Sequence, residues 1–176
     1  LPADKLMTRA RELASLLAGG PPLVFAAIKE VVRETQDMPF EEAMLRGGYP
    51  ELHQNPSLDS FSFHRSYVAT CLERDVRTLL AVSSLRDFER FMRACALRSA
   101  QILNRADLAR DVGISPSTAG EWLSVLQTSG HIVLLEPWFS NRTKSLVKSP
   151  KLYFADSGLL ATLLDIRNRE ELLRLR

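Results

Sequence analysis

The residue types that most often perform catalysis or bind metals are present in this chain, but their spacing does not assemble a reactive site. The histidines His53, His64 and His131 show no HxxxH spacing, and no CxxC pair accompanies them; zinc sites draw their ligands from such closely spaced clusters. The adjacent acids Glu41-Glu42 and Glu170-Glu171 would point to different sides of a helix, so neither pair could face one substrate as acid and base. We therefore expect no metal site, no cofactor and no catalytic residue.

Motifs for phosphate binding and for acyl chemistry are also missing. The chain contains no GxxxxGK[ST] loop for nucleotide phosphates, no GxGxxG turn and no GxSxG nucleophile elbow. The Gly19-Gly20 pair is followed by prolines and not by Lys. The sequence therefore predicts that the chain is not an enzyme.

Positive charge is concentrated in one short segment. The net charge of the whole chain is only +2, which by itself does not point to nucleic acid. The stretch from Trp138 to Lys151, however, carries Arg142, Lys144, Lys148 and Lys151 without any acidic residue. These four side chains are candidates for contacts with DNA phosphates.

A helix-turn-helix is predicted immediately before this basic stretch. Residues 104–130 read NRADLARDVGISPSTAGEWLSVLQTSG. Asn104 and Ser115 are suitable N-caps, and Pro116 suits the first position of a helix. Gly113 supplies the left-handed conformation that reverses the chain between two helices. These local signals predict two helices across a tight turn.

A β-hairpin is expected to follow the two helices. Residues 132–135 and 151–154 are β-rich runs that could pair, and a helix-turn-helix followed by such a hairpin, here about residues 131–155, is a winged helix. The exposed start of the second helix would present Ser117 and Thr118, which are weak base readers. We therefore expect non-specific contact with double-stranded DNA, with the wing on phosphates. The other interpretation is a protein partner beside an ordinary solvated basic loop.

The rest of the chain is also expected to be helical, so the predicted fold class is mainly α. In residues 1–46, helical periodicity on both sides of Gly19-Pro22 predicts a helical hairpin. A domain boundary is placed near residue 47, which leaves residues 47–176 as a helical domain that contains the winged helix. No transmembrane segment or secretory leader is recognised, so a cytoplasmic location is expected and no membrane partner. The oligomeric state is left open.

Four segments carry a resemblance to a known family. They are GGYPE at 47–51, SYVATCLERDVR at 66–77, the run from Phe88 through ILNRADLARDVGIS, and KSPKLYFADSGLLATLL at 148–164. Together they resemble the domain of unknown function that follows the ATPase core in bacterial and archaeal predicted AAA+ ATPases. The resemblance implies a noncatalytic accessory module of an ATP-binding protein, whose partner is DNA, the ATPase core or another protein.

In the same family a restriction-endonuclease-like domain usually follows this region. The segment KLYFADSGL resembles the first strand and turn of that domain, which would place Asp156 at its start. One acidic residue cannot hold a catalytic metal. The resemblance therefore assigns no nuclease site to this chain.

The first 46 residues resemble a different family. They are similar to the C-terminal helices of crotonase-fold enoyl-CoA hydratases, especially of the carnitinyl-CoA dehydratase type. The catalytic glutamates of those enzymes lie upstream of this region, so no catalytic role is implied for any residue here. The resemblance leaves an alternative interpretation, in which the chain is the C-terminal fragment of such an enzyme.

Overall fold

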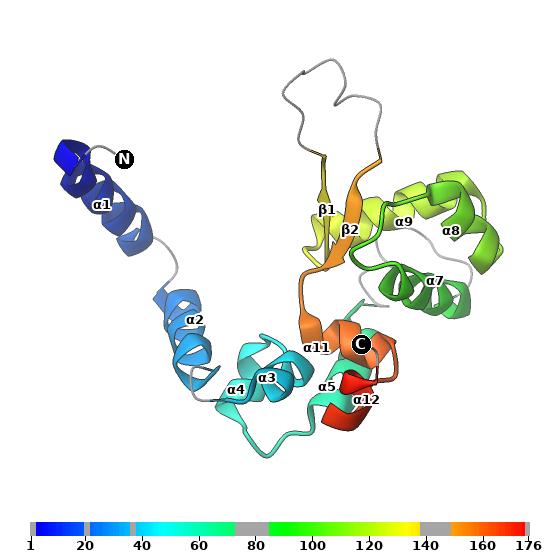
Figure 1. Cartoon of the computed structure of the whole chain (residues 1–176), viewed down its shortest axis with the longest axis horizontal. Coiled ribbons are helices and arrows are strands. Elements are labelled where there is room, and N and C mark those ends of the chain that lie inside the picture. The colour runs from blue at the N-terminus through cyan, green and yellow to red at the C-terminus, as the bar shows by residue number, and fades with distance from the viewer. Residues whose placement is uncertain (1–2, 20–21, 36–37, 73–84, 138–148, 175–176) are drawn as a thin grey trace.

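The computed structural model describes residues 3–19, 22–35, 38–72, 85–137 and 149–174. Within these ranges the chain is mostly helical and has one two-stranded antiparallel sheet (Figure 1). The predicted fold class, mainly α with a small β-hairpin, is confirmed. No helix in these ranges is both long enough and apolar enough to cross a bilayer.

The first two helices lead away from the remainder of the chain, with α2 still in contact with α4. They are α1 (Ala3–Ala18) and α2 (Pro22–Thr35). Figure 1 shows them following one another end to end, so the expected helices are present but are not folded back into the expected hairpin. The side chains of Leu6, Leu13 and Ile28 are 57%, 46% and 51% exposed. With these side chains exposed, α1 (16 residues) and α2 (14 residues) bury little surface against each other.

A group of short helices forms the lower part of the molecule in Figure 1. Its members from the first half of the chain are α3 (Phe40–Arg46), α4 (Pro50–Gln54), α5 (Ser60–Tyr67) and the π-helical turn η1 (Val68–Leu72). Its members from the end of the chain are α11 (Ser157–Leu163) and α12 (Arg169–Leu173). Helix α11 packs on α3 and α5, and α12 packs on α3. The two ends of this region therefore close on each other.

The middle of the chain forms the predicted two-helix unit and hairpin. Its elements are α7 (Leu85–Leu97), α8 (Arg105–Val112), α9 (Pro116–Thr128), β1 (Ile132–Leu135) and β2 (Lys151–Phe154). Asn104 caps α8, and Ser115 caps α9. Gly113 adopts φ 86° in the turn between them. The two helices, their caps and the turn glycine are confirmed as predicted.

The hydrophobic core lies between α7, α8, α9 and the inner face of the sheet. Trp122 of α9 meets Phe88 and Phe91 of α7 edge-on, with ring centroids 5.3 and 5.2 Å apart. The strands pair in a register that places Ile132 opposite Phe154 and Leu135 opposite Lys151. Ile132 and Leu152 close the core from the sheet side. Since burial of aromatic and aliphatic side chains drives folding, this core fixes α9 relative to the hairpin.

Candidate functional site

The start of α9 presents a cluster of hydroxyl groups held together by its cap. The Ser115 Oγ accepts a hydrogen bond from the backbone N–H of Thr118 at 3.1 Å. The same Oγ lies 2.7 Å from the Ser117 Oγ and 2.8 Å from the Thr118 Oγ1. Ser117 is exposed and Thr118 is half-buried. The two predicted contact residues of α9 therefore lie together at its first turn and already have local partners.

The remaining exposed face of α9 has little capacity to read bases. Glu121 and Ser124 are exposed on it, whereas Trp122, Leu123 and Leu126 are turned into the core. Arginine, lysine, asparagine and glutamine make the most informative contacts with base edges. The front half of this face has none of them, and Gln127 lies in the last turn of the helix. This surface is thus suited to contacts that do not depend on sequence.

Of the four basic residues singled out from the sequence, only Lys151 lies in the described part of the chain. It is the first residue of β2, is exposed, and has Leu135 as its partner across the hairpin. Arg142, Lys144 and Lys148 lie outside the described residues. Their expected position between β1 and β2 therefore stays a prediction.

The structure adds one basic residue that the sequence reasoning missed. Arg105 is the first residue of α8 and is exposed. Its Nη1 atom lies 3.6 Å from the position that a Cβ atom would take on Gly120, in the first half of α9. The guanidinium therefore lies beside the exposed face of α9. The sequence-based prediction considered only the second helix and the wing. The proximity of Arg105 to Gly120, fifteen residues later, follows no periodic pattern in the sequence.

A second cluster of polar residues joins the two ends of the helical region. The Asp156 Oδ2 accepts a hydrogen bond from the backbone N–H of Gly48 at 2.6 Å. The Asp156 Oδ1 accepts one from the N–H of Leu159 at 2.7 Å and so caps α11. The His64 Nε2 atom lies 3.5 Å from the same Oδ1. Asp156 therefore links α11 to α5 and to the loop after α3.

The environment of Asp156 favours its ionised form. Burial raises the pKa of its carboxyl, but His64 and the N–H groups of Gly48 and Leu159 outweigh burial, so the pKa lies below its ordinary value. A separation of 3.5 Å from His64 is long for a hydrogen bond. We therefore attribute the effect of His64 to its proximity and not to a hydrogen bond, and the two backbone N–H groups add to the lowering of the pKa.

Two glycines allow this close approach. A Cβ atom on Gly158 would lie 2.5 Å from the His64 Cε1 and 2.9 Å from the backbone carbonyl of Arg46. A Cβ atom on Gly47, which has φ 74°, would lie 2.5 Å from the Asp156 Oδ1. Both distances are shorter than real Cβ contacts. The segments GGYPE and KLYFADSGL, which are far apart in the sequence, thus meet beside His64 of α5 through residues that pack helices together.

The remaining histidines also have structural partners in different places. The His53 Nε2 lies 2.9 Å from the carbonyl oxygen of Gly47. The His131 ring lies 2.7 Å from the Ser129 Oγ and 2.8 Å from the Tyr67 hydroxyl, which ties the end of α9 to α5. Within the described ranges, no three His, Cys, Asp or Glu side chains lie close enough to hold a metal ion.

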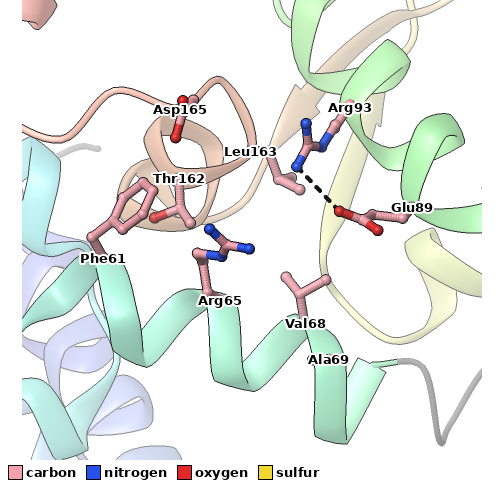
Figure 2. A pocket seen from close by; sticks show the side chains of 9 residues that line it. All are labelled: Phe61, Arg65, Val68, Ala69, Glu89, Arg93, Thr162, Leu163 and Asp165. Carbon is pink, nitrogen blue, oxygen red and sulfur yellow. Dashed lines mark hydrogen bonds and ion pairs between the residues drawn. The ribbon is translucent and has the colours of Figure 1, made fainter. Parts of the chain in front are cut away.

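A pocket separates the group of short helices from the two-helix unit. It lies between α5, α7 and the end of α11 and has a volume of about 150 Å³. Figure 2 shows Arg65 projecting into this pocket, with the ion pair between Glu89 and Arg93 on one side and Thr162 on the other. The pocket is lined by two acidic and two basic side chains: Glu89, Asp165, Arg65 and Arg93. Because these charges balance, the pocket favours neither an anion nor a cation.

Comparison with known proteins identifies one family along most of the chain. The model of a family described as a domain of unknown function, DUF8612, matches residues 38–170. The chain is 33% identical over 139 residues to "Uncharacterized protein Rv2008c" of Mycobacterium tuberculosis and to "Uncharacterized protein Mb2031c" of Mycobacterium bovis. Each alignment covers 78% of this chain and 32% of the relative, so the chain spans about a third of the length of these curated relatives.

A shorter part of the chain is similar to a protein of another family. The chain is 44% identical over 62 residues to the carnitinyl-CoA dehydratase of Escherichia coli strain K12, an alignment that covers 31% of this chain and 24% of the dehydratase. No solved structure matches the chain significantly. These comparisons support the predicted membership in a domain family of unknown function and a short likeness to a crotonase-type dehydratase.

Proposed function

This chain belongs to the DUF8612 family, and we propose that its central unit is a noncatalytic winged helix that binds duplex DNA without sequence preference. In this proposal α8 and α9 form the helix-turn-helix, and β1 and β2 form the base of the wing. Helix α9 approaches the major groove, and the basic side chains contact phosphates on either side.

The observation that carries the proposal is the combination of a capped α9 with a neighbouring exposed cation. The first turn of α9 presents Ser117 and Thr118, whose hydroxyl groups can donate to phosphate oxygens. Lys151, the exposed first residue of β2, supplies positive charge. A face without strong base readers, flanked by cations, fits binding in which phosphate contacts supply the affinity.

Two further expectations belong to this proposal. The resemblance to domains that follow an AAA+ ATPase core supports a role as an accessory module, with the DNA-binding unit attached to an ATP-binding protein. The similarity to carnitinyl-CoA dehydratase supports the alternative, a fragment of an enoyl-CoA enzyme, but it covers only 31% of this chain. We favour the first because the family match covers residues 38–170, which include both helices and the hairpin.

The proposal is tested by fluorescence anisotropy with labelled duplexes of unrelated sequence. If Arg142, Lys144, Lys148 and Lys151 each neutralise one phosphate, the logarithm of affinity should fall with the logarithm of salt concentration with a slope of about −3 to −4. Affinity should differ little between duplexes. Replacing Arg142 and Lys144 together with Ala should flatten the slope by nearly two, because about 0.9 ions are released for each phosphate.

Glu121→Ala is the matched control on α9. It removes a charge of the opposite sign from the same face, so it should leave the slope unchanged or slightly tighten binding. An absence of binding by the wild-type chain at low salt would overturn the DNA proposal. So would a double Arg142/Lys144 variant with the affinity and slope of the wild type, and the winged helix would then be assigned to protein contacts.

A further inference from the structure

We propose that Arg105 forms a second phosphate-binding point, at the start of α8 beside the first half of α9, and that this point helps to fix how α9 lies against the duplex. The proposal rests on the proposed DNA binding and extends it to a residue of α8. The ligand group is a backbone phosphodiester. Arg105 is a positioning residue, because a phosphate contact orients the protein without reading the sequence.

The guanidinium of Arg105 lies close to α9. Arg105 begins α8, yet its Nη1 lies 3.6 Å from the position that a Cβ atom would take on Gly120 in α9. Glycine has no side chain to fill this space. A positive charge that belongs to α8 therefore lies beside the face of α9 that carries Ser117 and Glu121.

The charge of Arg105 has no ionic partner in the described part of the chain. Two nearby arginines do have carboxylate partners: Arg98 pairs with Asp111, and Arg110 pairs with Asp107. Among the residues that the structure describes, no carboxylate lies within ion-pair distance of Arg105, and its side chain is exposed. An unpaired, planar guanidinium with five donors is well suited to a phosphate.

A second exposed cation lies near the entry to α8. Lys151 of β2 pairs across a β-bridge with Ile102, three residues before Arg105, and the Leu103 N–H donates to the carbonyl of Pro150 at 2.8 Å. The first helix of a helix-turn-helix crosses the phosphate backbone beside the groove. Cations at the start of α8 are therefore suited to hold that backbone while α9 lies in the groove.

The test compares the variants Arg105→Ala, Arg105→Lys and Arg110→Ala with the wild type, all in the full chain. Binding is measured by fluorescence anisotropy on the same set of labelled duplexes at several salt concentrations. With Arg105 as a fifth phosphate contact, the slope expected for the wild-type chain becomes about −4.5, and Arg105→Ala should reduce its steepness by about 0.9. Between about 50 and 200 mM salt, the wild type should therefore lose about 3.5-fold more affinity than this variant loses. Arg105→Lys keeps the charge and should keep the slope of the wild type.

Arg110→Ala is the control because it removes the same charge from the same helix at a residue paired with Asp107. It should change the slope by much less than Arg105→Ala. Thermal unfolding of each variant verifies that the fold is retained, and Arg105→Gln provides a neutral side chain of similar length if the alanine variant is unstable.

The outcomes separate this inference from the proposed function. If the wild-type chain binds DNA with the expected salt dependence but Arg105→Ala and Arg105→Gln have the same slope as the wild type, the inference is wrong and the wing-based function stands. An equal effect of Arg105→Ala and Arg110→Ala also overturns it, because only net charge would then matter. If the wild type does not bind, both proposals fail.

Discussion

Removal of the Asp156 carboxylate should destabilise the chain more than removal of an ordinary helix cap does. In Asp156→Ala the cap of α11 is lost, which costs about 1 kcal/mol. The charge-assisted hydrogen bond to the Gly48 N–H is lost as well, which costs about a further 1.5 kcal/mol. We expect the free energy of unfolding to fall by about 2–3 kcal/mol, which corresponds to a melting temperature lower by about 5–10 °C for a chain of this length.

Asp59→Ala is the matched control within the same molecule. Asp59 caps α5 by accepting a hydrogen bond from the Ser62 N–H at 2.8 Å, and its described contacts are local. Its replacement should cost only about 1 kcal/mol. Asp156→Asn should give an intermediate loss, because an amide oxygen can still cap α11 while its NH₂ group cannot accept from Gly48.

The assay is urea unfolding followed by circular dichroism, together with thermal melts of the same variants. The difference between Asp156→Ala and Asp59→Ala measures what the link to Gly48 contributes to stability. If the two variants lose equal stability, the hydrogen bond between Gly48 and Asp156 contributes nothing to stability. The interpretation that Asp156 holds the two ends of the helical region together would then be wrong.

Three other outcomes follow from the same structure. Because the folded-state pKa of Asp156 is lowered, its stabilisation should be complete above the unfolded pKa of about 3.9 and be lost as pH falls through the folded pKa; urea titrations should show the gap between wild type and Asp156→Asn shrinking in that acidic range, and a constant gap would argue against it. Gly158→Ala, whose Cβ would overlap His64, should cost more than Gly113→Ala, which meets no atom within 4 Å and adds only backbone strain of about 1 kcal/mol; melting curves would contradict this if the order were reversed. Amide hydrogens of α1, whose Leu6, Met7 and Leu13 side chains are exposed, should exchange faster than those of α9, and greater protection in α1 would show that it has a packing partner.

The sequence could predict the elements whose determinants are local. Asn104, Gly113 and Ser115 act on backbone groups within a few residues, so α8, α9 and the turn between them were predictable from the letters alone. The pairing of β1 with β2 followed from two β-rich runs and was also found. Local capping and alternation therefore account for most of the central unit.

Contacts between residues far apart in the sequence could not be predicted from local patterns. Asp156 was noted only for its likeness to the start of another domain, because its partner Gly48 lies 108 residues away and no periodicity connects them. Arg105 was missed because its neighbour belongs to the next helix. The hairpin expected for α1 and α2 was wrong in its packing, since helical periodicity predicts each helix but not whether two thin apolar faces suffice to join them.

The bond between Gly48 and Asp156 also constrains the order in which the chain can fold while it is being synthesised. Helices α3 and α5 are synthesised before the central unit, but their packing partner α11 begins 111 residues after the end of α3 and 90 residues after the end of α5. Helices α7, α8 and α9, which lie between them in the chain, have mainly sequence-local contacts with one another and can form early. The nascent chain therefore carries an incomplete helical region, with the α11 side of α3 and α5 uncovered, until translation has passed α11.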